Sequence, residues 1–358
     1  MKTDDPVSRA RALEGSLLGT AVGDALGLAC EGLSAARQRK MFPQLDRYGF
    51  LFGYGMCSDD TEHAVMLAQS LIVSGGDAAR LQRDFAWRLK GWLAGLPAGI
   101  GLATLRAIIK LWLFVPPRWS GVRSAGNGPA MRAAVLGVAY GDDPERLRAL
   151  NRVAAGITHR DVRAEEGALA VAVAAHLATT RRYPLSPQEW LEEVSRYLDA
   201  GGDTLAAIRL AVVSVERGES AQTLLDQIGS RGGVSGFMLH TLPAVVHVWL
   251  RHQDDFVSGI EEMIRLGGDT DTAAAILGGI IGARVGREGL PAALLERLVD
   301  WPRSTTYIAR VAARLAQSRA SGTSLREVPL FLPLLWPRNL FFMIVVLLHG
   351  FRRMLPPY

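Results

Sequence analysis

Two short acidic clusters are the parts of the sequence best suited to chemistry. The first is Ser58-Asp59-Asp60-Thr61, and the second is Gly268-Asp269-Thr270-Asp271-Thr272. Each cluster follows a turn and opens an apolar stretch of helical periodicity. One interpretation is therefore two capped helices, since Ser, Thr and Asp are good N-cap residues. Capping accounts for one or two oxygen-bearing side chains at a helix start, but not for three or four.

Metal binding accounts for the additional oxygen atoms. Four carboxylates that converge repel one another strongly unless cations neutralise them. Sites built from carboxylates and hydroxyls suit hard divalent cations, Mg²⁺ or Mn²⁺. Two clusters indicate two metal ions, as in other two-metal centres. The sequence contains neither the spacing of an EF-hand loop nor an HExxH motif.

Two predicted helices carry glycine at every fourth position, and these helices must position the acids. The glycines are Gly15, Gly19, Gly23 and Gly27 in one helix, and Gly278, Gly282 and Gly286 in the other. An interior glycine costs roughly 0.5–1 kcal/mol relative to alanine, whereas a bare ridge lets a neighbouring backbone come very close. We therefore expect both helices at the centre of the fold. Glu31 follows the first ridge and is expected to reach the metals, while Asp24 within it is interpreted as a buried structural acid.

The elements around these residues are predicted to be helical throughout. Strand-like alternation is nearly absent, and runs rich in Ala, Leu and Arg show 3.6-residue periodicity. The simplest prediction is one all-α domain, a single-domain orthogonal helical bundle over residues 1–319, followed by an apolar C-terminal extension over 320–358. The expected helices span 8–30, 61–74, 77–94, 99–113, 129–139, 144–155, 163–180, 187–199, 203–217, 220–228, 236–251, 254–266, 272–287, 290–299 and 304–318.

These motifs resemble those of the ADP-ribosylglycohydrolase family. The segment 19–31 resembles the family's opening helix and its gating glutamate, and the two acidic clusters resemble its two metal motifs. Gly126–Arg132 resembles the family's Asn-Gly-x-x-Met-Arg segment, and Thr158-His159 resembles its histidine segment. The resemblance covers about residues 10 to 300, in the family's order.

The resemblance implies an all-α fold with a dinuclear Mg²⁺ or Mn²⁺ centre. It also implies hydrolysis of the bond between C1″ of the distal ribose of ADP-ribose and an acceptor, which reverses ADP-ribosylation. Family acceptors include arginine, serine, free small molecules and polymer ends. Glu31 is similar to the mobile acid of the family, and either Asp60 or Glu31 is the expected acid/base catalyst. The implied metal ligands are Ser58, Asp59, Asp60, Asp269, Asp271 and Thr272.

The loop before residue 129 is the candidate phosphate-binding segment. It precedes a predicted helix and suits an anion cradle, although an Asn-Gly turn has the same sequence. His159 is a candidate partner for a phosphate or a ribose hydroxyl, or else a structural hydrogen bonder. Ala125 stands where some relatives place an aromatic residue. That departure leaves a second hypothesis, hydrolysis of a related phosphoribosyl or nucleoside-diphosphate compound, and a third, a catalytically silent relative that binds ADP-ribose. The candidate binding residues are Ser124, Gly126, Asn127, Gly128 and His159.

Composition limits the remaining possibilities. The chain has 358 residues, 49% of them hydrophobic and 21% charged, with a net charge of +5. This excludes a disordered chain, and two cysteines exclude a disulfide scaffold. The arginines are scattered, so no nucleic-acid partner is expected. The first ten residues lack the apolar region of a secretory signal, and a cytoplasmic location is expected.

The C-terminal extension is strongly apolar. Its longest uninterrupted run, 340–348, is too short to cross a bilayer. One interpretation is an anchor at a membrane surface, in which Trp336, Arg338, Arg352 and Arg353 meet anionic lipid. The favoured interpretation is packing of the extension on the domain or on a second subunit.

Overall fold

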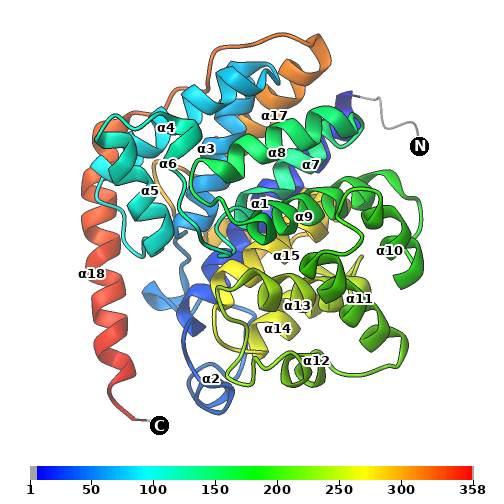
Figure 1. The fold of residues 1–358 in the computed structure, drawn as a ribbon. Coiled ribbons are helices and arrows are strands. Elements are labelled where there is room, and N and C mark those ends of the chain that lie inside the picture. Colours follow the sequence, from blue (N-terminus) through cyan, green and yellow to red (C-terminus); the bar gives the residue numbers. More distant parts are fainter. Residues whose placement is uncertain (1–5, 357–358) are drawn as a thin grey trace.

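A computed structural model describes residues 6–356, and all regular secondary structure in that range is helical. Extended pairings in that range are single bridges, such as Val122 with His159. The fold is all-α, as predicted, and its helices surround a central pair (Figure 1). In chain order the α-helices are α1 (Pro6–Gly27), α2 (Ala35–Met41), α3 (Asp59–Ser74), α4 (Ala78–Ala94), α5 (Leu102–Trp112), α6 (Pro117–Ser120), α7 (Ala134–Tyr140), α8 (Pro144–Gly156), α9 (Val162–Thr180), α10 (Pro187–Ser195), α11 (Asp203–Glu216), α12 (Ala221–Gln227), α13 (Met238–Arg251), α14 (Phe256–Arg265), α15 (Thr270–Val285), α16 (Ala292–Arg297), α17 (Thr305–Ser321) and α18 (Leu335–Arg353).

The glycine ridges form the central contact of the fold, between α1 and α15. A Cβ atom added to Gly19 would lie 2.2 Å from the carbonyl oxygen of Gly278, and one on Gly15 would lie 2.2 Å from that of Gly282. The next pair along the ridge, Gly23 with Ala274, shows the same 2.2 Å approach. The residue numbers of the contacting positions on α15 decrease as those on α1 increase, so the two helices are antiparallel. This contact places the start of α15 beside the end of α1, as the ridges predict.

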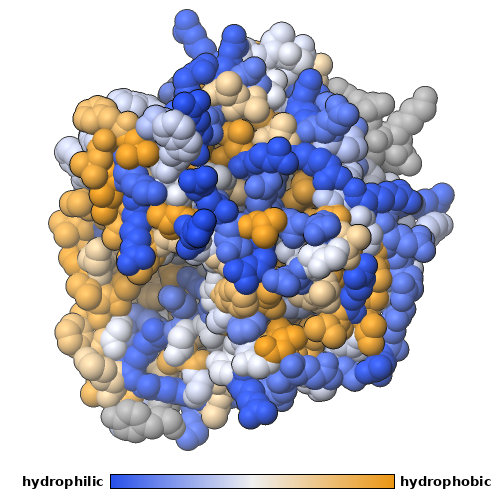
Figure 2. All heavy atoms as spheres, in the orientation of Figure 1, coloured by the Kyte–Doolittle hydropathy of each residue, from blue (hydrophilic) through white to orange (hydrophobic). Residues whose placement is uncertain are grey.

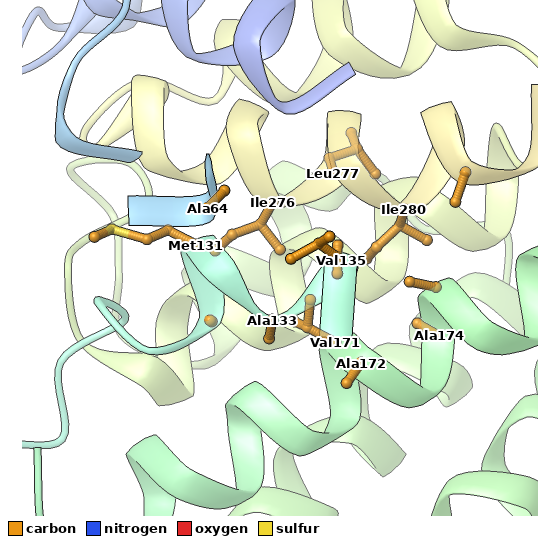
Figure 3. Packing of buried hydrophobic residues seen from close by; sticks show 14 of the residues in the cluster. Ala64, Met131, Ala133, Val135, Val171, Ala172, Ala174, Ile276, Leu277 and Ile280 are labelled. Carbon is orange, nitrogen blue, oxygen red and sulfur yellow. The ribbon is translucent and has the colours of Figure 1, made fainter. Parts of the chain in front are cut away.

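A layer of helices encloses this pair and forms the apolar core. In Figure 3, Val135 of α7, Val171 of α9 and Ile280 of α15 point toward one another. The contact between α7 and α9 is also close, because a Cβ on Gly137 would lie 1.8 Å from the carbonyl oxygen of Ala172. The core thus holds the elements that carry the acidic clusters in fixed positions.

Each helix expected from the sequence coincides with an observed one, whereas α2, α6 and α18 were not expected. Helix α18 contains Pro337 and begins five residues before the apolar run 340–348. Pro337 lies in the first turn, where backbone N–H groups have no partner within the helix, so the proline removes no hydrogen bond. Helix α2 is only seven residues long and begins at its N-cap, Ser34.

Helix α18 runs along one edge of the molecule (Figure 1). Together with the preceding turn it forms a helical segment, Leu332–Arg353, that is long and apolar enough to cross a membrane, and only 22% of its most apolar window is buried. This segment is longer than the apolar run 340–348, which by itself is too short to cross a bilayer. The domain boundary at residue 320 stays a prediction.

Candidate metal centre

The two acidic clusters meet at the N-termini of α3 and α15. Ser58 is the N-cap of α3, and its hydroxyl accepts a hydrogen bond from the Asp60 N–H at 3.3 Å. Asp269 is the N-cap residue of α15. The Thr272 hydroxyl donates to Asp60 Oδ2 across the two helices at 3.3 Å. Residues about 210 positions apart in the sequence, at 60 and 272, therefore share one oxygen-rich centre.

The donor atoms in this centre fit a hard divalent cation. Oδ1 of Asp60 and Oδ1 of Asp271 are both buried and have no hydrogen-bond partner. Oδ2 of Asp60 accepts from the Ser58 hydroxyl at 3.0 Å. Within residues 6–356, no three Asp, Glu, His or Cys side chains are already close enough to hold an ion by themselves. The donor set here also includes the hydroxyls of Ser58 and Thr272, and unpartnered carboxylate oxygens are what a cation would satisfy.

The carboxylates of the two clusters act on one another electrostatically. Burial raises the pKa of Asp60, and the charges of Asp59, Asp24 and Asp269 raise it further. Burial likewise raises the pKa of Asp271, with further contributions led by Glu31 and Asp269. The charges of the two clusters therefore act on one another, and their mutual repulsion favours either protonation or a bound cation.

Asp24 has the structural role that the sequence analysis favoured. Its carboxylate is fully buried in α1 and accepts hydrogen bonds from the backbone N–H of Ser58 at 3.0 Å and from the Thr61 hydroxyl at 2.6 Å. The backbone N–H of Thr61 donates as well, at 3.2 Å. Burial raises the pKa of Asp24 to about 7, although these bonds act in the opposite direction. Asp24 thereby fixes the first cluster to the central helix.

Glu31 lies where the end of α1 meets the second cluster. The N–H of Gly32 donates to the Gly268 carbonyl at 2.7 Å, which ties the two loops together. Glu31 itself reaches the surface. Desolvation by the surrounding protein raises the pKa of Glu31. The charge of Asp269 raises this pKa further, and the charge of Arg353 lowers it. Glu31 is thus an accessible acid at the rim of a buried acidic centre.

The candidate phosphate-binding loop lies against the second cluster and against the segment before α13. The Asn127 side-chain amide donates to Asp269 Oδ2 at 2.7 Å and to the Thr241 hydroxyl at 3.1 Å. The Asn127 N–H donates to the Gly236 carbonyl at 2.9 Å, and the Gly126 N–H to the Ser124 hydroxyl at 3.3 Å. Two backbone donors of the expected cradle are therefore used within the protein. The contact of Asn127 with Asp269 was not foreseen from the sequence.

His159 lies under the two glycines of this loop. A Cβ on Gly126 would be 3.0 Å from the His159 ring, and one on Gly128 would be 2.9 Å from it, so a side chain at either position would crowd the ring. Its Nδ1 lies 2.9 Å from the Thr158 hydroxyl. Burial, and then the charge of Arg132, lower the pKa of His159 to about 3. The imidazole is therefore neutral near pH 7 and acts as a hydrogen-bonding group rather than as a cation.

Arg132 holds the loop and the histidine segment together. This buried guanidinium donates to the Gly128 carbonyl at 3.0 Å and to the Thr158 hydroxyl at 2.7 Å. It also donates to the Ala154 carbonyl at the end of α8, at 3.0 Å. The Met-Arg part of the motif is thus structural support for the residues beside the acidic centre.

A buried ion-pair network behind the first cluster was missed by the sequence analysis. Glu62, the residue after Thr61, pairs with Arg303 and Arg338 and accepts a hydrogen bond from the Trp92 indole. Burial would raise the pKa of Glu62, but the two arginines outweigh it and lower that pKa. The position of an acid directly after the cluster is the only sequence signal for this network.

The same network excludes the lipid contact that the membrane-anchor interpretation gave to Arg338. Arg338 is 6% exposed and pairs with Asp300 as well as with Glu62. It also donates to the Cys57 carbonyl at 2.6 Å, one residue before the first cluster. The arginine is buried because two carboxylates inside the domain require a counter-charge.

The fold is all-α, and a buried centre of carboxylates and hydroxyls lies where α3 and α15 begin. A family model described as ADP-ribosylglycohydrolase matches residues 4–324, and the chain belongs to this family. It is accordingly a hydrolase that acts on glycosidic bonds.

The chain is also similar to individual proteins over most of its length. The chain is 32% identical over 290 residues to an uncharacterised protein of Archaeoglobus fulgidus, covering 79% of this chain and 90% of that protein. It is 28% identical over 298 residues to the ADP-ribosyl-[dinitrogen reductase] glycohydrolase of Rhodospirillum rubrum, covering 79% and 89%. A solved chain titled "ADP-ribosylglycohydrolase-related protein complex" superposes with a TM-score of 0.65 and 28% identity, over 87% of this chain and 99% of that one.

Proposed function

We propose that this protein removes ADP-ribose from an acceptor by metal-dependent hydrolysis of the bond at C1″ of the distal ribose. The observation that carries the proposal is the pair of buried, unpartnered carboxylate oxygens on Asp60 and Asp271. They lie in clusters at two helix N-termini that one hydrogen bond joins, within the fold of a glycohydrolase family.

Two divalent ions, Mg²⁺ or Mn²⁺, are the proposed cofactors. When bound, they would neutralise the acids and polarise ribose hydroxyls and a water molecule. The proposed ligands are Ser58, Asp59, Asp60, Asp269, Asp271 and Thr272.

Other residues of the chain support these ligands and supply the proton. Asp24 holds the backbone of the first cluster, and Asn127 orients Asp269 through its amide. Cleavage at C1″ builds positive charge on the ribose, so a nearby proton donor and a nearby carboxylate both assist it. Glu31, accessible and with a raised pKa, fits a proton-transfer role. Asp60 is the second candidate for that role.

The proposed contacts to the pyrophosphate and ribose come from the loop and from His159. A neutral His159 fits a ribose hydroxyl better than a phosphate, because it carries no charge near pH 7. We propose arginine, serine or a small molecule as the acceptor. A cytoplasmic location is also proposed, and two free, buried cysteines, Cys30 and Cys57, support it. The proposed binding residues are Ser124, Gly126, Asn127, Gly128 and His159.

The test measures release of ADP-ribose from ADP-ribosyl-arginine and ADP-ribosyl-serine conjugates, with Mg²⁺, with Mn²⁺ and with EDTA. We expect release with one metal or both, none with EDTA, and none from the double variant Asp269→Asn/Asp271→Asn. The matched control is Asp226→Asn, an exposed acid on α12 away from the centre. It should keep full activity.

Two other outcomes would contradict the proposal. Two bound metals by elemental analysis without release from either conjugate would favour the phosphoribosyl or nucleoside-diphosphate hydrolase. Neither release nor bound metal would reject the metal-dependent enzyme.

A further inference from the structure

The outer face of α18 is an unpartnered apolar stripe. Its residues recur every three or four positions and so share one side of the helix. Leu340 is 65% exposed, Leu348 63% and Phe351 61%. Figure 2 shows apolar surface along this edge of the molecule. The large apolar residues exposed on this helix are Trp336, Leu340, Phe341, Ile344, Leu347, Leu348 and Phe351.

Exposed aromatic residues of α4 and α5 lie beyond the start of α18. The Trp336 indole donates to the Ala94 carbonyl at 3.1 Å, which joins α18 to the end of α4. The ammonium group of Lys90 on α4 lies over three aromatic rings. They belong to Trp87 on the same helix, Trp112 on α5 and Phe114 just after α5. All three rings are exposed. We call α18's outer stripe, together with this aromatic cluster, the α18 face.

The two segments that form the α18 face carry only basic side chains, although Glu31 acts on Arg353 at the end of α18. The sequence contains no acidic residue in 85–141 or in 328–358, whereas these segments contain seven and three basic residues. The acids that directly precede the two segments, Asp84 and Glu327, both pair with Arg88. Lys90 and Arg352 therefore border the apolar surface without acids of the same segments beside them.

The inner face of α18 fixes how the helix can meet a membrane. Arg338 is held by Glu62 and Asp300, and the Asn339 amide donates to the Gly95 carbonyl at 2.7 Å. Near the other end, His349 Nε2 lies 2.9 Å from the Ala29 carbonyl. Crossing a bilayer would break these buried contacts, which is costly for charged groups. The helix is therefore suited to lie along a surface with its outer face outward.

A second copy of the chain fits the α18 face less well than lipid does. In a two-fold dimer the same patch faces itself, so the basic residues at its border would meet basic residues. An anionic bilayer offers acyl chains to the apolar stripe and phosphates to the cations, and aromatic side chains favour the interface between them.

We propose that the α18 face binds the surface of an anionic lipid bilayer, with α18 parallel to the membrane plane. This inference goes beyond the proposed hydrolase function and does not depend on it.

The test is flotation of the full chain with vesicles. We expect binding to vesicles of phosphatidylcholine with 30% phosphatidylglycerol (about one anionic lipid in three, a strongly anionic surface), weaker binding at high salt, and little binding to pure phosphatidylcholine. The double variant Ile344→Glu/Leu348→Glu should reduce binding at least about tenfold, because each substitution replaces apolar contact with a charge. Replacing Lys90 and Arg352 together by glutamine should remove the preference for anionic vesicles.

The matched control is Leu210→Glu/Val213→Glu, on α11 at another side of the molecule (Figure 1). It should leave vesicle binding unchanged, and circular dichroism should show both double variants folded. Absence of binding to anionic vesicles would overturn the proposal, as would equal binding to neutral ones. A lipid-free dimer that Ile344→Glu/Leu348→Glu dissociates, measured by light scattering, would also overturn it and make the face a subunit interface.

Discussion

Arg338 of the last helix donates to Glu62 of the third at 3.0 Å, with both side chains almost fully buried. The same guanidinium holds the Cys57 carbonyl just before the first acidic cluster. The C-terminal helix therefore contacts residues directly beside the first acidic cluster of the candidate metal centre.

Removing that cation should destabilise the fold. In Arg338→Met, Glu62 retains Arg303, but Asp300 loses its ion-pair partner. Loss of one member of a buried pair typically costs about 3–5 kcal/mol, so we expect a loss of that order in the free energy of unfolding, measured with urea. The control Arg352→Met, an exposed residue of the same helix, should change stability little. Equal effects of the two variants would show that the network contributes nothing specific.

Filling the glycine ridge should separate the central helices. In Gly19→Ala the new methyl would lie 2.2 Å from a backbone oxygen that cannot turn away, and overpacking of this kind costs about 1–3 kcal/mol or more. In the control, Gly91→Ala on α4, the methyl meets no atom within 4 Å. That substitution should stabilise the protein by up to about 1 kcal/mol, because alanine favours the helix. Thermal unfolding of both variants measures the contrast, and a stable Gly19→Ala would show that the helices are not in tight contact.

Asn127→Ala should weaken the metal centre without unfolding the protein. The substitution removes the hydrogen bond that orients Asp269, and loss of a residue that supports a metal ligand typically costs about 10–100-fold in affinity or activity. Calorimetric titration with Mn²⁺ measures the affinity, and circular dichroism reports the fold. If Mn²⁺ affinity is unchanged, Asn127 does not position Asp269.

Asp142 should contribute to stability in acid. Burial raises the pKa of its carboxyl, but Arg319 and Arg9 outweigh this, so the folded-state pKa lies below the usual 3.8. A depressed carboxyl pKa stabilises the fold above the unfolded-state value, and this stability is lost as pH falls through the folded-state pKa. Asp142→Asn should therefore be less stable than the parent near pH 6 and should lose less stability on acidification below about pH 4. Unfolding measured across that range tests the sign, and Asp226→Asn is the control. Parallel pH profiles for Asp142→Asn and the parent would contradict it.

The sequence predicted the features that depend on local pattern. Glycine at every fourth position predicted the contact of α1 with α15, and paired acids at helix starts predicted a common centre. The role of Asp24 followed from one charge in an apolar helix. These inferences succeed because the physical cause lies within a few residues of the pattern.

Contacts between distant segments were not predictable in the same way. Nothing near Arg338 indicates that its partner lies 276 positions earlier, and nothing in an Asn-Gly turn indicates that its amide reaches Asp269. Such pairings depend on how the helices assemble. The helix in the apolar extension was likewise not predicted, because only the run 340–348 was considered and α18 begins at Leu335.

The order of synthesis gives the Arg338 contact a further consequence. Glu62 and Asp300 leave the ribosome before the arginine that neutralises both, so a nascent chain that stops short of residue 338 must bury Asp300 without its cation. Such a fragment would fold poorly and expose apolar surface to proteases. The last helix therefore supplies the charge that completes the buried ion-pair network behind the candidate metal centre.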